Sequence, residues 1–135
     1  MIEAETSETV PFYDTDCGGV VSNIAYLRYI EKARTLLFAG LGMPASDMME
    51  SGLFPAVVRT EIDYRAAARL ADEIRVTARI TAVDKVRVTC SFELTARSEE
   101  GEPRPVASAL QVVALVQLPE GRPRRIPAEW FKLIE

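Results

Sequence analysis

The sequence predicts an α+β fold in which one long apolar helix is wrapped by an antiparallel sheet of about five strands. Apolar residues recur at helical spacing from residue 23 to about residue 41, and four later segments have the alternation or the apolar length of β-strands. A helix that is apolar on most of its sides is buried by something larger than one neighbouring helix, and a broad sheet is such a partner.

The first elements are a strand and this helix. Residues 6–13 (TSETVPFY) are extended in character and precede a turn-forming aspartate pair, so they predict a first strand. Asn23 can cap the start of the helix, and Gly42 follows its end at Leu41. One polar stripe runs along the helix at Arg28, Glu31, Lys32 and Thr35.

The rest of the chain predicts four strands. After a connector over residues 43–54, strands are expected at 55–64, 73–83, 86–97 and 106–118. The second and third of these alternate apolar and polar residues and are joined by a turn at Asp84-Lys85. The fourth is nearly continuous in apolar character, which favours a place inside the sheet.

Composition limits the possible functions. A chain of 135 residues with 48% apolar and 27% charged residues predicts one soluble globular domain over residues 1–135. An acidic start and the lack of a long apolar stretch favour a cytoplasmic protein without a membrane span. The net charge of −4 argues against nucleic-acid binding.

The chain has no histidine, which excludes Ser-His-Asp and Cys-His catalytic sites. Its two cysteines are far apart in the sequence and have no metal-ligand spacing, so no metal site is predicted. Acid–base chemistry would then fall to carboxylates, tyrosines, lysines or cysteines.

The segment DTDCGGVVSN (residues 14–23) places two carboxylates and two glycines directly before the helix. The first turn of a helix presents unpaired N–H groups that can stabilise an oxyanion, and Asp16 is placed to act on the same carbonyl carbon. An Asx-type turn at Asp14 and Asp16, with a chain bend at Gly18-Gly19, explains the same residues without catalysis. The local pattern alone leaves both interpretations open.

A longer motif extends from this loop into the helix. It reads Tyr13-Asp14-Thr15-Asp16-x-x-Gly19-Val20-Val21-x-Asn23-x-x-Tyr26-Leu27-x-Tyr29-x-Glu31-x-Ala33-Arg34. This motif resembles the signature of hotdog-fold thioesterases of the 4-hydroxybenzoyl-CoA thioesterase type, which include the acyl-CoA thioesterases associated with the Tol-Pal envelope system. The segment DYRAAARLAD (63–72) also resembles that family's strand-turn-strand, and the resemblance covers essentially the whole chain.

The resemblance implies a hotdog fold and hydrolysis of an acyl-CoA to a free acid and CoA, with no metal or organic cofactor. It implies that Asp16 is the catalytic nucleophile or general base, and that the backbone N–H near Asn23 polarises the thioester carbonyl. It further implies a homodimer or homotetramer in which sheets join edge to edge and each active site is built from two subunits.

Further substrate contacts are expected around this loop and on basic residues. The loop and helix candidates are Gly18, Gly19, Val20 and Tyr26, although aromatic residues on a buried helix more often belong to the core. The phosphates of CoA need cations, and the candidates for these are Arg59, Arg65, Arg69, Lys85 and Arg87, with Arg122, Arg124 and Arg125 as a second patch.

Three residues near the loop have alternative interpretations. Arg34 lies among apolar helix positions, so we expect it to pair with Glu31 or with the Asp14 loop. Glu31 is an alternative base, disfavoured by its place on the polar stripe. Cys17 is disfavoured as a nucleophile because no base or thiolate-stabilising group lies near it in the sequence.

Asn23 stands where many close relatives carry histidine, so an acyl carrier protein stays open as the thioester carrier. A non-catalytic hotdog protein that binds an acyl thioester or a carrier protein is the alternative from another functional class. A hotdog dehydratase is disfavoured because that chemistry commonly relies on histidine.

Overall fold

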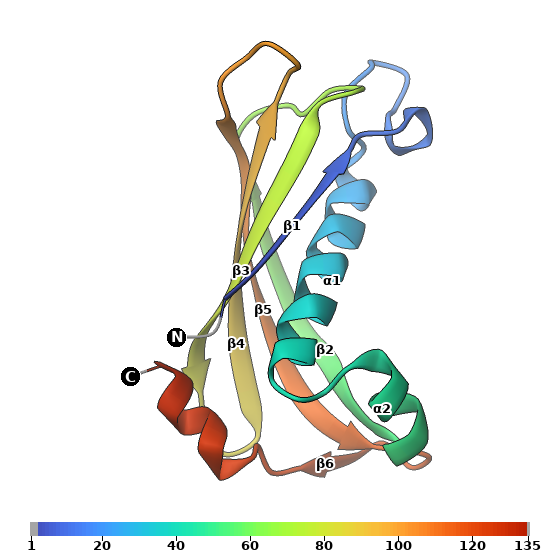
Figure 1. The fold of residues 1–135 in the computed structure, drawn as a ribbon. Coiled ribbons are helices and arrows are strands. Elements are labelled where there is room, and N and C mark those ends of the chain that lie inside the picture. The colour runs from blue at the N-terminus through green and yellow to red at the C-terminus, as the bar shows by residue number, and fades with distance from the viewer. Residues whose placement is uncertain (1–2, 135) are drawn as a thin grey trace.

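The computed structural model describes residues 3–134, in which one antiparallel sheet curls around one long helix (Figure 1). The strands are β1 (Glu3–Thr9), β2 (Leu53–Tyr64), β3 (Glu73–Val83), β4 (Arg87–Arg97), β5 (Arg104–Gln117) and the short β6 (Arg122–Arg124). Their order is β1-β3-β4-β5-β2, and β6 pairs with β5. The helices are α1 (Asn23–Gly40) and α2 (Ala45–Ser51), with 3-10 helices η1 (Phe12–Asp14) and η2 (Ala128–Ile134). The predicted α+β class is confirmed, with a sheet of six strands.

The core lies between α1 and the concave face of the sheet. From α1, Tyr29, Ile30, Ala33, Leu37 and Phe38 are almost completely buried, and they pack with the inward-facing residues of the sheet. Apolar residues of α1 outside this buried face are not covered, since Ile24, Leu27 and Leu36 keep 71%, 42% and 49% of their surface exposed. The helix is therefore buried on fewer sides than its composition indicates.

The first strand ends earlier than predicted. β1 stops at Thr9, and the last bond in its register with β3 runs from the N–H of Val10 to the carbonyl of Asp72 at 2.8 Å; the N–H of Asp72 turns away to the carbonyl of Arg69. Pro11 has no N–H to offer a neighbouring strand, and residues 12–14 turn into η1. The prediction of a strand over 6–13 is thus wrong in its second half.

The connector 43–54 contains a short helix that periodicity did not indicate. α2 begins after Pro44 and ends at Ser51, and Gly52, which follows it, has a positive φ of 73°. β3 has the predicted bounds, whereas β2, β4 and β5 begin or end one or two residues from the predictions.

The two ends of the sheet carry different loops and helices. The loop end carries residues 10–22, the β2–β3 turn (65–72) and the β4–β5 turn (98–103). The far end carries the β3–β4 turn (84–86), α2, β6 and η2 (Figure 1). At the far end, Trp130 of η2 packs edge-on against Phe38 of α1 with ring centroids 5.8 Å apart.

Candidate functional site

Residues 14–22 form a small hairpin immediately before α1. The carbonyl of Asp14 accepts the N–H of Ser22 at 2.8 Å, and the N–H of Asp16 donates to the carbonyl of Val20 at 2.9 Å. The N–H of Gly19 donates to the carbonyl of Asp16 at 3.0 Å and closes the tip, where Gly19 has a positive φ of 77°. The hairpin therefore presents Asp16 near its tip, a few residues before the first turn of α1.

The Asp16 carboxylate is exposed and has a local structural contact. Its Oδ1 accepts the backbone N–H of Gly18 at 2.8 Å, which is an Asx-type turn. A Cβ added at Gly18 would lie 3.2 Å from the same oxygen, so a larger residue there would crowd the carboxylate. The turn role and a catalytic role are compatible, because the turn engages only one of the two carboxylate oxygens.

The start of α1 supplies hydrogen-bond donors beside this hairpin. The helix begins at Asn23 with Ser22 as its N-cap, and no side chain caps it, so the prediction of Asn23 as the cap is wrong. Neither the N–H of Asn23 nor that of Ile24 finds an acceptor among residues 3–134. These N–H groups and the positive end of the helix dipole favour an acceptor or a developing negative charge in front of the helix.

The other aspartate of the hairpin, Asp14, is buried and bonded to α1. Only 6% of its surface is exposed, and its Oδ2 accepts bonds from the Arg28 guanidinium and, at 2.7 Å, from the Tyr29 hydroxyl. Burial is the main cause that raises the pKa of Tyr29, with the hydrogen bond to Asp14 second. The hydrogen bond between Arg28 and Asp14 is the main cause that raises the pKa of Arg28.

This network was not predicted from the sequence. Arg34, the expected partner, instead donates to Gln111 Oε1 at 2.7 Å and to Glu31 Oε1 at 3.3 Å. Its expected pairing with Glu31 is therefore confirmed, whereas the Asp14 loop is bound by Arg28. The sequence contained one signal for this contact: among the residues of the polar stripe on α1, Arg28 is the one closest in sequence to the loop.

The β2–β3 turn holds the hairpin from another side. The carbonyl of Ala68 accepts the N–H of Val21 at 2.8 Å, and a β-bridge joins Val20 to Arg69. The turn is itself fixed by buried Asp72, whose Oδ2 accepts Arg104 Nη2 at 2.7 Å and the N–H of Arg69 at 3.0 Å.

Tyr26, expected to contact substrate or to belong to the core, is only 3% exposed. Its hydroxyl accepts the N–H of Ala68 at 3.3 Å, and its ring packs edge-on against Tyr64. Burial raises the pKa of Tyr26, so the hydroxyl stays protonated near neutral pH. The contacts of Tyr26 therefore connect α1 to the β2–β3 turn.

The basic residues expected to hold CoA phosphates do not lie close together within one chain. Arg65 lies at the loop end and donates to Ser108 Oγ at 2.7 Å, and Arg59 in the middle of β2 pairs with Glu61. Lys85 and Arg87 lie at the far end. The eleven residues of β3 separate the two ends by roughly 35 Å.

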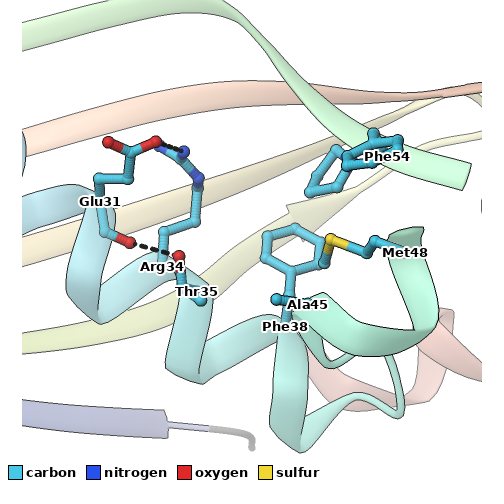
Figure 2. A pocket seen from close by; sticks show the side chains of 8 residues that line it. Glu31, Arg34, Thr35, Phe38, Ala45, Met48 and Phe54 are labelled. Carbon is cyan, nitrogen blue, oxygen red and sulfur yellow. Dashed lines mark hydrogen bonds and ion pairs between the residues drawn. The ribbon is translucent and has the colours of Figure 1, made fainter. Parts of the chain in front are cut away.

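A pocket of about 180 Å³ lies between α1, α2 and the start of β2 (Figure 2). Glu31, Arg34 and Thr35 form its polar side, and Phe38, Met48 and Phe54 form an apolar side. Glu31 is eight residues along α1 from Asn23, which is about 12 Å of helix. The pocket and the Asp16 hairpin are thus separate features of one chain.

The described part of the chain has neither a metal cluster nor a membrane-spanning helix. Within residues 3–134, no group of three or more His, Cys, Asp or Glu side chains is placed to hold a metal ion. None of the helices in that range combines the length and the apolar character needed to cross a bilayer.

Comparisons with known proteins identify the family. Residues 10–132 match the thioesterase-like superfamily. The chain is 31% identical over 121 residues to the acyl-CoA thioesterase YbgC of Haemophilus influenzae, a match that spans 89% of this chain and 85% of the relative.

Solved structures agree in fold. The 4-hydroxybenzoyl-CoA thioesterase of Pseudomonas sp. strain CBS-3 superposes with a TM-score of 0.86 at 19% identity, covering 98% of this chain and 99% of that chain. An aspartate-to-asparagine variant of 4-hydroxybenzoyl-CoA thioesterase, in complex with 4-hydroxybenzoyl-CoA, gives a TM-score of 0.85 at 18% identity with full coverage of both chains. The predicted hotdog fold and the predicted enzyme class, a thioesterase, are confirmed at the level of the family. With its sequence and fold in agreement, the chain belongs to the thioesterase-like superfamily.

Proposed function

We propose that this protein hydrolyses acyl-CoA thioesters with Asp16 as the catalytic carboxylate. The observation that carries the proposal is the exposed Asp16 carboxylate in the hairpin that leads into α1, whose N–H groups at Asn23 and Ile24 have no acceptor among the described residues. Acyl transfer needs a base or nucleophile and oxyanion donors around one carbonyl group. The hairpin and the helix start supply both kinds of group.

Two balanced routes use the same carboxylate. As a general base, Asp16 takes a proton from water, the hydroxide adds to the thioester carbon, and the C–S bond breaks as the protonated Asp16 returns its proton to the departing thiolate, which gives the free acid and the CoA thiol. As a nucleophile, Asp16 attacks that carbon, expels the thiolate and forms an anhydride that water then hydrolyses. In both routes the N–H of Asn23 stabilises the negative charge that develops on the carbonyl oxygen.

We further propose that the active unit contains two copies of the chain joined along β2. β2 is a twelve-residue edge strand that pairs only with β5 among the described strands, and unprotected edges of this length recruit another strand. Val57, Val58 and Tyr64 of β2 are exposed, as are Ile24 and Leu27 of α1. These exposed apolar side chains, which on β2 are interspersed with the charged Arg59, Glu61 and Asp63, favour a partner sheet, and a dimer or tetramer is the expected assembly.

Such pairing explains why the predicted residues lie at two ends of one protomer. In an antiparallel two-fold pair, the Tyr64 end of one β2 lies beside the Leu53 end of the other. The far end of the partner, with its Lys85 and Arg87, then comes to the side of the Asp16 hairpin, where cations can bind CoA phosphates.

In the paired arrangement, the partner's pocket beside α2 also lies on the side of the Asp16 hairpin. Its volume of about 180 Å³ is close to that of an engineered cavity of about 150 Å³ that holds benzene. We propose that the pocket of one protomer receives the acyl part of a substrate bound at the Asp16 hairpin of its partner.

Thiol release from a panel of acyl-CoA esters, followed with a thiol-reactive dye, tests the proposal. Asp16→Asn and Asp16→Ala should lower kcat by about a hundredfold to ten-thousandfold, as expected for loss of a general base. Glu93→Gln is the matched control, because Glu93 is an exposed carboxylate on β4, outside both the hairpin and the proposed β2 interface. Equal rates in wild type and both Asp16 variants would contradict the proposal and favour a non-catalytic protein that binds acyl thioesters.

Two further measurements distinguish the general-base route from the nucleophilic route, and CoA from an acyl carrier protein as the carrier of the thioester. Single-turnover hydrolysis in heavy-oxygen water leaves the label out of the protein in the general-base route, so label in Asp16 would contradict that route. Equal panels of acyl-CoA and acyl-carrier-protein thioesters determine the preferred carrier. A cytoplasmic location stays a prediction.

A further inference from the structure

We propose that Asp14 is a positioning residue that holds the catalytic hairpin against α1 through Arg28 and Tyr29. The proposal rests on the proposed function, because it concerns the placement of Asp16. Asp14 itself is buried and does not reach a substrate, so it acts through the main chain of residues 14–16.

The bonds of Asp14 close a ring between the hairpin and the helix. Its carbonyl accepts the N–H of Ser22, the residue before α1. Its carboxylate Oδ2 accepts the guanidinium of Arg28 and the hydroxyl of Tyr29, which lie about one and a half turns into the helix. One residue is thus fixed by its main chain at the helix start and by its side chain farther along.

Because Asp14 is buried, its bonds to Arg28 and Tyr29 favour one position of the hairpin on α1. Asp14 is 6% exposed and Tyr29 is 1% exposed, and a buried carboxylate that loses its donors is strongly disfavoured. Because burial raises the pKa of Tyr29, its hydroxyl keeps the proton that it donates to Asp14. A shift of the hairpin along α1 would separate the carboxylate from both donors at once.

Arg28 also faces a second carboxylate. Its Nη1 lies 3.8 Å from Oε1 of Glu8 on β1, and that oxygen is buried without a hydrogen bond. The guanidinium therefore has an alternative partner if Asp14 is removed. Loss of Asp14 leaves the 14–16 arm of the hairpin without its side-chain bonds to α1, while the other arm keeps the bond from Val21 to Ala68.

The arm that is released carries Asp16. Reacting groups must be held close to their productive geometry, and a displacement of about 1 Å can lower a rate by about a hundredfold. Because the hairpin contacts the reacting carbonyl and not the remote parts of CoA, loss of position should reduce kcat more than it raises KM.

The test compares Asp14→Ala with Asp14→Asn, using the acyl-CoA that wild type hydrolyses best. Both donors bond to one oxygen of Asp14, so the amide oxygen of asparagine can accept both. We expect Asp14→Ala to lower kcat by about tenfold to a hundredfold, with a smaller change in KM. Asp14→Asn should recover most of the lost kcat because it keeps the bonds and removes only the charge.

Three further variants separate the position of the hairpin from the general stability of the protein. Val88→Ala opens a cavity in the core at the far end, where Val88 is completely buried, and should lower the melting temperature without lowering kcat. Tyr29→Phe removes one of the two donors and should give a smaller loss than Asp14→Ala. The double variant Asp14→Ala with Tyr29→Phe should lose no more than Asp14→Ala alone, because both changes break the same contact.

The possible outcomes are distinct. If Asp16→Asn is inactive while Asp14→Ala keeps the kcat of wild type, the positioning role is wrong and the proposed function stands. Equal losses in Asp14→Ala and Asp14→Asn would also overturn it, since charge and not position would then be responsible. A loss of kcat that disappears when rates are expressed per folded molecule overturns it as well. If Asp16→Asn is as active as wild type, the proposed function fails first.

Discussion

The loop end and the far end of the sheet are held together by different kinds of contact. At the loop end, Asp14 and Asp72 are buried carboxylates, each bonded to an arginine and to a second donor. At the far end, Trp130 and Phe38 pack edge-on in an apolar cluster.

The difference follows from what each end has to do. Apolar packing is non-directional and tolerates small displacements, whereas hydrogen bonds between buried charged groups fix distances and angles. Under the proposed function, the loop end positions a catalytic carboxylate, and directional contacts suit that role. We therefore expect changes in the buried packing of the far end to alter stability more than activity, because that end supplies only the proposed acyl pocket and CoA contacts, and changes at the loop end to alter stability and activity together.

The largest expected effect is the loss of stability on removing the far-end aromatic contact. Trp130 is 4% exposed, so Trp130→Ala should lower the free energy of unfolding by about 3 kcal/mol, the lower part of the range for large aromatic truncations. The urea midpoint of unfolding measures this change, and kcat of the folded protein should fall less than in the loop-end variants, because Trp130 reaches the proposed acyl pocket only through its contact with Phe38.

Phe131→Ala is the matched control for that truncation. Phe131 follows Trp130 in η2 but is 38% exposed, so its removal should cost clearly less. A large fall in kcat for Trp130→Ala, with a small loss of stability, would contradict the proposed separation of the two ends.

A smaller loss of stability, joined to a loss of activity, is expected for the ion pair that holds the β2–β3 turn. Asp72→Ala leaves Arg104 without its carboxylate, and because the Arg104 side chain is 35% exposed the cost should be about 2 kcal/mol, below the range for fully buried pairs. The turn contacts the hairpin through Ala68 and Arg69, so kcat should fall as well. Urea unfolding and steady-state kinetics on the same preparation measure both effects.

Glu73→Ala provides the comparison at the next position. Glu73 lies 3.7 Å from both Arg75 and Arg97 in an exposed cluster, and such surface pairs contribute about 0–1 kcal/mol. If Glu73→Ala and Asp72→Ala behaved alike in both stability and kcat, burial would not be what distinguishes the two carboxylates.

The sequence predicted the long periodic elements well and the loops poorly, for physical reasons. The bounds of β3 and the start of α1 follow from side-chain periodicity over ten or more residues. α2 is only seven residues long and is delimited by Pro44 and Gly52, so no periodic signal could establish it. β1 ends where Val10 bonds to Asp72, a contact between segments distant in sequence.

The candidate site shows the same division. Asp16 was identified from its motif, but nothing local distinguishes it from Asp14, since both are aspartates in one turn. Their different burial depends on the path of the hairpin over Arg28 and Tyr29. The distance of Lys85 from the Asp16 hairpin could have been predicted from the sequence. β3 and β4 form an antiparallel pair, so the turn between them, which contains Lys85, lies at the opposite end of the sheet from residue 73.

The smallest expected effects concern two glycines, Gly19 in the hairpin before α1 and Gly40 at the end of α1. Gly19 has a φ of 77°, a conformation that costs other residues about 1 kcal/mol, so Gly19→Ala should destabilise the protein by about that amount. Gly40 ends α1 without a positive φ, and a Cβ added there would meet no neighbouring atom within 4 Å, so Gly40→Ala should stabilise the helix by up to about 0.5 kcal/mol. Thermal melts of the two variants should therefore shift in opposite directions, and only Gly19→Ala should also lower kcat, since Gly19 closes the tip that carries Asp16. Shifts of the same sign would show that the hairpin tip is not held in the conformation on which the placement of Asp16 depends.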